Sequence, residues 1–249
     1  MVLDLKVVLK NEIIVKNYER TYMKKLNKYI GVKLISILCI FSTILNASLI
    51  DDGYNEQKKG NLVQAAKIYE QACNKDDYDA CSRLAYMNVN GKGIKVNKRK
   101  AVELYSKVCQ KTNRKCDTLA WMYHEGEGVR QDKHKFIQLS KQACDHNDYV
   151  GCQFIGYAYR DGDIVKQNKP QAIQIFSSMC VMRTNNKFNK AIAQQSCIDA
   201  GFIYYNNGHA SKSDIDLAKE YFGKGCDLGD SSACKNYKIL NEQGFDANL

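Results

Sequence analysis

The sequence has little proline and no long apolar run. A single proline in 249 residues suits long helices and argues against a β-sandwich with many turns. The longest apolar run, from Leu34 to Leu45, is shorter than the ~20 residues that span a bilayer. With 45% hydrophobic and 26% charged residues, the chain is able to bury a core and is not a disordered polymer.

The apolar run lies within a pattern typical of a secretory signal peptide. From Met23 the chain reads MKKLNKYIGVKLISILCIFSTILNASLIDDG, which is basic, then apolar, then small and polar. We therefore expect residues 1–22 to be an upstream extension, with translation starting at Met23, and residues 23–48 to be a signal peptide. The residues before Cys39 lack the order expected of a lipid-attachment site. An uncleaved anchor stays open as an alternative. After cleavage we expect no stable membrane insertion.

The positive charge lies largely in this targeting segment. The whole chain carries a formal net charge of +10, and residues 1–48 contain eight basic and three acidic residues. The remaining residues therefore have a net charge of +5, which is scattered along the sequence. This distribution argues against nucleic acid as a partner.

Cysteine is abundant and regularly spaced. Eleven cysteines are many for a cytosolic protein, so a secreted or periplasmic location is expected. Ten of them follow the signal peptide and fall in order into five pairs, whose first members are 36, 35, 36 and 46 residues apart. A fixed period of this length indicates a solenoid in which each unit buries its apolar face against its neighbours.

A helix is predicted before the first cysteine of each pair. Twelve residues before that cysteine stands an asparagine or aspartate, a good N-cap because its side-chain oxygen accepts a hydrogen bond from the first helical turn. Apolar residues then recur at helical spacing, and Pro170 falls in a first turn, where its missing N–H costs little. The expected caps are Asn61, Asn97, Asp132, Asn168 and Asp214.

A second helix is predicted to start near the second cysteine of each pair. Ten residues after that cysteine, Gly91, Gly126, Gly162 or Gly244 is expected to end the helix, because glycine accepts the left-handed conformation. The fourth unit has Asn207-Gly208 there. Residues 49–249 are thus predicted to form five helix-pair units, opened by a helix near 51–60 and closed by a capping helix near 232–243.

The repeat resembles the Sel-one-like repeat, a relative of the tetratricopeptide repeat. The resemblance rests on LAWMYHEGEGVRQDKHKFIQLSKQA, Leu119 to Ala143, and on its counterparts from Leu84 and Ile155. The added cysteine pairs resemble the Helicobacter cysteine-rich protein family of secreted proteins. The resemblance implies an all-α, right-handed α-solenoid of helix-turn-helix repeats with one disulfide per repeat. The fourth unit departs from it, because about ten extra residues between Cys180 and Cys197 are expected to lengthen a connection.

The cysteines suit disulfides better than metal or redox chemistry. Zinc favours pairs two to four residues apart, whereas the gaps here are six, seven or sixteen residues, and no Cys-x-x-Cys occurs. The four histidines share no repeat position. We therefore expect no metal and no cofactor. Spacing alone leaves about a thousand pairings open, and the ordered one is expected: Cys73–Cys81, Cys109–Cys116, Cys144–Cys152, Cys180–Cys197 and Cys226–Cys234.

The helix after each second cysteine carries an aromatic column. Five residues past the cysteine stand Tyr86, Trp121, Tyr157, Phe202 and, in the last unit, Ile239. The core side is assigned to the residues three, four and seven past it, so the column points toward the expected concave face. With the neighbours Asp117, His124, Gln153 and Arg160 it suits a peptide, protein or cell-wall ligand such as a peptidoglycan fragment. Packing of the rings between repeats is the open alternative.

Enzymatic activity is implied by the resemblance alone. Related proteins carry assignments as β-lactamases, hydrolases of cyclic amides, and as penicillin-binding proteins, so β-lactams are a further possible ligand. Ser232-Ala233-Cys234-Lys235 is the only Ser-x-x-Lys match, one that chance readily produces, and no Ser-Asp-Asn or Lys-Thr-Gly accompanies it. The residues themselves identify no catalytic group. A binding scaffold is therefore the main interpretation, and a weak β-lactamase is the alternative.

Overall fold

The computed structural model describes residues 49–182, 186–206 and 210–242, and every regular element in them is a helix. The expected signal peptide and upstream extension, as well as Gly208 and Gly244, lie outside the described residues. The chain divides into two compact units, Met1–Asp77 and Tyr78–Leu249. Among the helices described, none is both long and apolar enough to cross a membrane.

The first unit contains the opening helix and the first helix of the repeat pattern. Residues 49–58 are helical, and α2 spans Leu62–Asn74. Tyr69 of α2 is fully buried, and its hydroxyl donates a hydrogen bond to Gln57 Oε1 at 3.0 Å. The side chain of Tyr69 therefore fixes α2 against the opening helix.

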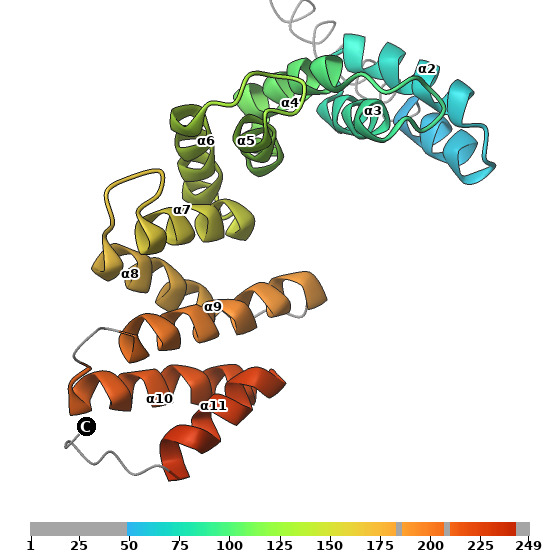
Figure 1. Ribbon diagram of the computed structural model, residues 1–249. Helices are drawn as coiled ribbons and strands as arrows, with labels where there is room; N and C mark the ends of the chain where they lie inside the picture. Colours follow the sequence, from blue (N-terminus) through green and yellow to red (C-terminus); the bar gives the residue numbers. More distant parts are fainter. Residues whose placement is uncertain (1–48, 183–185, 207–209, 243–249) are drawn as a thin grey trace, which may run out of the picture. The chain divides into compact units, whose positions relative to one another are not determined.

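The second unit contains nine further helices in its described residues (Figure 1), α3 to α11, and each follows the last after a short connection. Their bounds are Tyr78–Asn90, Lys98–Thr112, Cys116–Glu125, Lys133–Asp145, Tyr149–Asp161, Lys169–Cys180, Lys187–Tyr205, Lys212–Asp227 and Ser231–Glu242.

Consecutive helices of this unit pack on one another from α3 to α11. In addition α5 contacts α7, α7 contacts α9 and α9 contacts α11, while α8 contacts α10. The odd-numbered and the even-numbered helices thus form two layers, with the core between them. This is the predicted solenoid of helix pairs.

Buried residues hold these layers together across repeat boundaries. One hydrophobic cluster joins α3 to α6, another joins α7 to α9, and a third joins α9 to α11. The largest fully buried side chains in the unit include Phe176 of α8 and Phe222 of α10. Because each cluster spans more than one helix pair, no repeat buries its apolar face alone.

Three of the predicted N-caps are confirmed. Asn97, Asp132 and Asn168 each accept a hydrogen bond from the backbone N–H three residues later. Pro170 lies in the first turn of α8, as predicted. Gly91, Gly126 and Gly162 have φ of 67°, 72° and 75°, which confirms the left-handed helix ends.

One predicted N-cap is right in position only, and one is wrong. Asn61 is the N-cap residue of α2, but its side chain accepts no capping hydrogen bond, and its Nδ2 instead donates to Glu56 Oε2 at 2.7 Å. The cap of α10 is Ser211, and Asp214 lies three residues inside the helix. There Asp214 accepts hydrogen bonds from the Ser211 N–H and hydroxyl, which forms a capping box. Asp214 therefore stabilises the N-terminus of α10 from within its first turn.

The extra residues of the fourth unit are largely helical, whereas a lengthened connection was expected. Helix α9 begins at Lys187, ten residues before Cys197, and its N-cap Asn186 accepts hydrogen bonds from the N–H groups of Phe188 and Asn189. The insertion therefore extends α9 at its N-terminus.

The predicted disulfide pairing is confirmed within the second unit. The Cα atoms of Cys109–Cys116, Cys144–Cys152, Cys180–Cys197 and Cys226–Cys234 lie 4.9, 4.5, 4.6 and 4.5 Å apart, which suits a disulfide. Cys73 and Cys81 are disulfide-bonded as well. Each of the four measured bridges ties the end of one helix to the following helix, so the repeat period and the cross-link period coincide.

Candidate functional site

The aromatic column occupies the same position of α3, α5, α7 and α9, away from the buried side of each helix. We call Tyr86, Trp121, Tyr157 and Phe202 the odd-helix face. Tyr86, Trp121 and Phe202 are 47%, 45% and 39% exposed, and Tyr157 is partly exposed. On these four helices the residues three, four and six past the second cysteine are buried instead, as with Leu119, Ala120 and Met122 on α5. The third and fourth positions are thus confirmed as the core side, whereas the predicted seventh position is only partly buried at Tyr123, Tyr159 and Tyr204.

Trp121 is held by stacking from two sides. Its ring lies 5.3 Å from the His124 ring and 5.8 Å from the Phe154 ring of α7, both nearly parallel to it. Phe136 of α6 contacts both flanking rings. Part of Trp121 therefore packs between repeats, while nearly half of its surface stays exposed.

Tyr157 takes part in a polar contact between α7 and α9. Its hydroxyl donates to Asp199 Oδ2 at 3.1 Å, and Arg160 Nη1 donates to Asp199 Oδ1 at 3.0 Å. The Arg160 guanidinium also lies 4.7 Å above the Tyr157 ring and pairs with Asp161. Tyr157 thus has internal partners on both its ring and its hydroxyl.

Burial raises the pKa values of Asp199 and Tyr157. Asp199 is 5% exposed, and desolvation raises its pKa although Arg160 and Tyr157 act to lower it. The pKa of Tyr157 is raised strongly, first by burial and then by Asp199. The hydrogen bond to Asp161 raises the pKa of Arg160, which stays charged. The group is therefore a charged, half-buried link between repeats.

Asp117 follows Cys116 in the first turn of α5 and lies one turn before Trp121. Burial and then the charge of Asp148 raise the pKa of Asp117. Its side chain accepts a hydrogen bond from the hydroxyl of Thr118 at 3.2 Å. Burial, with Asp117 and Tyr86 nearby, raises the pKa of Tyr105 to about 12. Asp117 therefore lies in a partly apolar setting close to the aromatic column.

The remaining predicted site residues are Phe202, His124 and Gln153. Phe202 packs edge-on against Phe222 of α10 at 5.2 Å. His124 Nδ1 lies 2.8 Å from Glu125 Oε1, and Gln153 is partly exposed on α7. The structure therefore brings Trp121 and His124 together on α5, and Tyr157 and Arg160 together on α7.

Asp199 and Phe154 complete these groups and were not predicted. Both lie two residues past a second cysteine, a position that carries no aromatic or acidic pattern in the other units. A signal for Asp199 exists, because it is an acidic residue inside the apolar stretch CIDAGFI. No comparable signal distinguishes Phe154 from a core residue.

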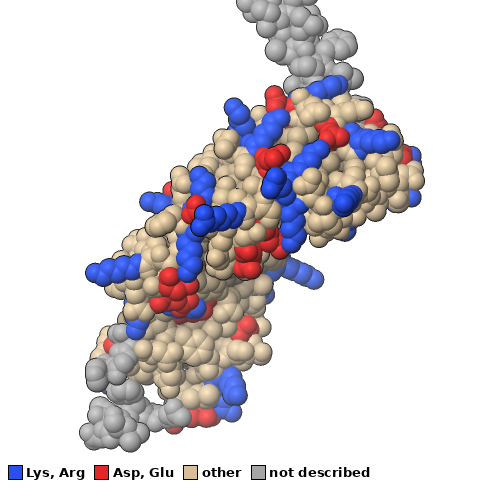
Figure 2. Space-filling model, turned by 45° about the horizontal axis from the view of Figure 1, so that its top comes forward, with Lys and Arg blue, Asp and Glu red and all other residues tan. Residues whose placement is uncertain are grey.

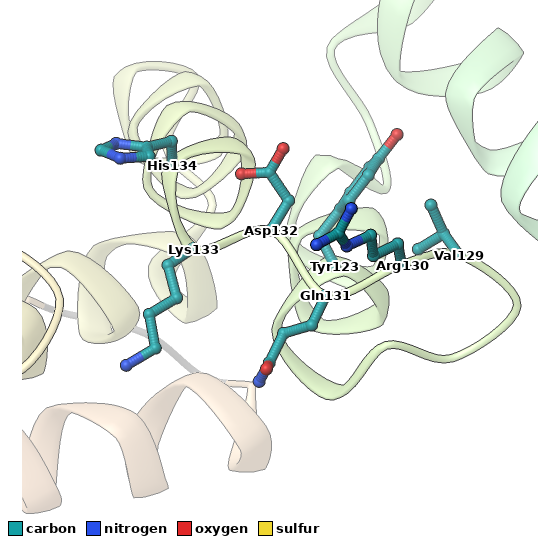
Figure 3. A pocket seen from close by; sticks show the side chains of 7 residues that line it. All are labelled: Tyr123, Val129, Arg130, Gln131, Asp132, Lys133 and His134. Carbon is teal, nitrogen blue, oxygen red and sulfur yellow. The ribbon is translucent and has the colours of Figure 1, made fainter.

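A shallow pocket of about 490 Å³ lies at the connection between α5 and α6 (Figure 3), lined by Tyr123, Val129, Arg130, Gln131, Asp132, Lys133 and His134. None of the predicted site residues lines it. The side chains of Lys133 and His134 point away from Tyr123 in this view, and Asp132 is engaged as the cap of α6. The polar groups do not converge on one point, so this pocket is a weaker candidate than the odd-helix face.

Two further sequence features are the Ser-x-x-Lys match of α11 and the side chains able to ligate a metal. Ser232 is exposed near the start of α11, and Cys234 of the same motif is bonded to Cys226. No group of three or more His, Cys, Asp or Glu side chains is placed to hold a metal ion in residues 49–182, 186–206 and 210–242. On the face shown in Figure 2, basic and acidic side chains are interspersed over the helices.

Comparison with solved structures gives matches at low sequence identity, and the first two share this fold. A Sel1 repeat protein from Oxalobacter formigenes is 21% identical with a TM-score of 0.64, and the match covers 82% of each chain. A protective antigen of uropathogenic Escherichia coli with an SLR fold is 19% identical with a TM-score of 0.60. That match covers 73% of this chain and 37% of the antigen. Helicobacter pylori cysteine rich protein B is 24% identical with a TM-score of 0.38, over 70% of this chain and 93% of that protein.

The repeat itself is recognised along most of the helical region. No curated protein matches the chain. The Sel1 repeat profile matches residues 49–77, 79–113, 119–148, 150–180 and 194–230. Each matched segment ends at or just after an even-numbered helix, from α2 to α10. These segments make up well over half of the chain, and the protein therefore belongs to the Sel1 repeat family.

Proposed function

We propose that this protein is a disulfide-linked scaffold that binds an extended segment of a partner protein along the odd-helix face. The observation that carries the proposal is the exposure of aromatic rings at the same position of alternate helices, on Tyr86, Trp121 and Phe202. Aromatic side chains are the usual anchors of protein interfaces. Repeat arrays present such anchors along an extended surface, which suits an extended ligand.

The rigidity of the surface supports binding. Trp121 is fixed by His124 and Phe154, and Cys116 at the start of α5 is buried and bonded to Cys109. A preorganised ring loses little conformational entropy when a ligand covers it. The bridged cysteines also suit an oxidising compartment, so we place the protein outside the cytosol, either secreted or in a periplasm.

Selection from a random-peptide display library tests the proposal. The oxidised protein is the target, and selected peptides are measured by calorimetry against the Tyr86→Ala/Trp121→Ala variant. We expect peptides with micromolar Kd whose affinity falls about tenfold or more in that variant. Phe188→Ala is the matched control, because Phe188 is 62% exposed and lies in the N-terminal extension of α9, away from the column.

Two results contradict the proposal. One is a library that yields no binder of the oxidised protein. The other is a set of peptides that bind the double variant and the native protein equally well. Soluble peptidoglycan fragments are added in the same assay, and a response of Trp121 fluorescence to these glycans alone assigns the face to cell-wall ligands.

Hydrolysis of nitrocefin, a β-lactam, distinguishes the alternative function, a β-lactamase, from a binding scaffold. No contact of Ser232 in the structure supports an activated nucleophile, so we expect no hydrolysis by the oxidised protein above that of Ser232→Ala. Turnover by the native protein that the Ser232→Ala variant loses contradicts this expectation and restores the β-lactamase interpretation.

A further inference from the structure

The link between α7 and α9 shows how this fold holds a cation. The Arg160 guanidinium lies between the Tyr157 ring, 4.7 Å below it, and the carboxylate of Asp199, whose Oδ1 is 3.0 Å from Nη1. Tyr157 stands five residues and Arg160 eight residues past Cys152, and Asp199 belongs to the next odd-numbered helix. One ring, one cation and one carboxylate therefore join neighbouring repeats.

A ring at the same position and a carboxylate one residue out of register occur two repeats earlier, without that cation. Tyr86 stands five residues past Cys81, and Asp117 of the next odd-numbered helix stands one residue past Cys116, where Asp199 stands two past Cys197. The position of Arg160 is taken by Val89, which packs against the hydrophobic core. Tyr86 and Asp117 both lie close enough to Tyr105 of α4 to raise its pKa, so a ring and a carboxylate lie near the same core residue, and an apolar residue stands in place of the arginine.

Asp117 lacks a cationic partner among the described residues. None of the ion pairs described for residues 49–182, 186–206 and 210–242 includes Asp117. The nearby charges are Asp148, which repels it, and Lys115, which attracts it less strongly. A half-buried carboxylate with this surplus of negative charge favours a positive ligand.

The aromatic neighbours of Asp117 are also suited to a cation. Trp121 is four residues further along α5 and hence on the same side of the helix, and tryptophan is the ring that attracts cations most strongly. Tyr86 already attracts an ammonium group, because Lys92 Nζ lies 5.0 Å from its ring centre and 3.2 Å from its hydroxyl. Lys92 is exposed, so a partner's cation is able to displace it.

We propose that Tyr86, Asp117 and Trp121 bind a cationic side chain, lysine or arginine, of the partner segment. This inference rests on the proposed function and adds the chemistry of the partner. The carboxylate pairs with the cation, the two rings cover its apolar stem and its charged face, and the rest of the segment follows the column toward α7.

Two peptides that differ only in charge test the inference. The probes are acetyl-Ala-Arg-Ala-amide and the same peptide with citrulline, which has nearly the same shape and no charge. Binding is followed by NMR from the backbone amide of Asp117 and the indole N–H of Trp121. We expect the arginine peptide to bind about fivefold or more tightly than the citrulline peptide.

Two variants make the result specific. In Asp117→Asn the preference for arginine should disappear, while Asp216→Asn, which neutralises an exposed carboxylate on α10, should keep it. Equal binding of both peptides by the native protein, or an unchanged preference in Asp117→Asn, overturns the inference. If display peptides nevertheless bind through Trp121, the proposed function stands without it. If neither probe nor any display peptide binds, both are wrong.

Discussion

Trp121 is the residue at which packing and exposure meet. It is the single tryptophan of the sequence, it stacks on His124 and Phe154, and 45% of it is exposed. Its fluorescence therefore reports on the odd-helix face alone. The exposure of this position followed from helical spacing within α5. The contact with Phe154 did not, because it depends on how far α7 is rotated against α5, which no local spacing specifies.

Asp117 should make the stability of the folded protein depend on pH. The pKa of Asp117 is raised in the folded protein, so its contribution to stability is fully present below the ordinary value of 3.8 and is lost as the pH rises through the raised pKa. Asp117→Asn should therefore melt at a higher temperature than the native protein at pH 7, and the difference should vanish at acidic pH. Thermal melts across this range measure it. A variant that is less stable at pH 7 contradicts the assignment.

Asp199 should matter more to stability than Asp161, although both pair with Arg160. Asp199→Ala leaves the Tyr157 hydroxyl and one guanidinium nitrogen without their acceptor, which should cost about 1–3 kcal/mol. Asp161 is 47% exposed at its side chain, so Asp161→Ala should cost under about 1 kcal/mol. Urea denaturation followed by circular dichroism compares the two variants. Equal losses of stability would show that Asp199 contributes no more to the folded state than the exposed Asp161.

At the scale of the helices, most boundaries could be predicted from the sequence. Asn97, Asp132 and Asn168 cap their helices because capping depends on a few adjacent residues. The errors have local causes of their own. Ser211 competes with Asp214 for the same helix end and takes the cap position. The residues before Cys197 contain no proline or glycine, so they continue α9 where a connection was expected.

The connection between α5 and α6 allows a test of close packing. Gly126 and Gly128 both have φ of 72°. A Cβ at Gly126 would have ordinary contacts, the nearest at 3.5 Å, whereas a Cβ at Gly128 would overlap the backbone carbonyl of Lys98 in α4. Gly126→Ala should cost about 1 kcal/mol through its backbone conformation. Gly128→Ala should cost about 2 kcal/mol more. Urea denaturation of both variants checks this, and equal costs contradict the close approach.

At the scale of the whole molecule, the cysteine period predicted the order and number of the repeats. Contacts that join one repeat to the next were beyond the sequence, as with Tyr157 and Asp199, which are 42 residues apart. Such contacts depend on how neighbouring helix pairs pack on one another. The candidate site was therefore predicted as a set of positions, and its division into a Trp121 group and a Tyr157 group came from the structure.

Removal of single disulfides should destabilise the chain according to loop length. The Cys180–Cys197 bridge closes 17 residues and Cys226–Cys234 closes 8. Chain entropy gives losses of about 3 and about 2.5 kcal/mol when each pair is replaced by alanine. Urea denaturation followed by circular dichroism tests both, with the fully reduced native protein as the lower limit. If that reduced protein unfolds at the same urea concentration as the oxidised one, the bridges do not support the scaffold.

Hydrogen exchange in the presence of a display-selected peptide shows whether the odd-helix face is the binding surface. Exchange of the oxidised protein is followed by mass spectrometry with and without the peptide. We predict slower exchange in α3, α5 and α7 when the peptide is bound, and unchanged exchange in α4, α6 and α8. Protection confined to the even-numbered helices, or to the connection at residues 129–134, would contradict it.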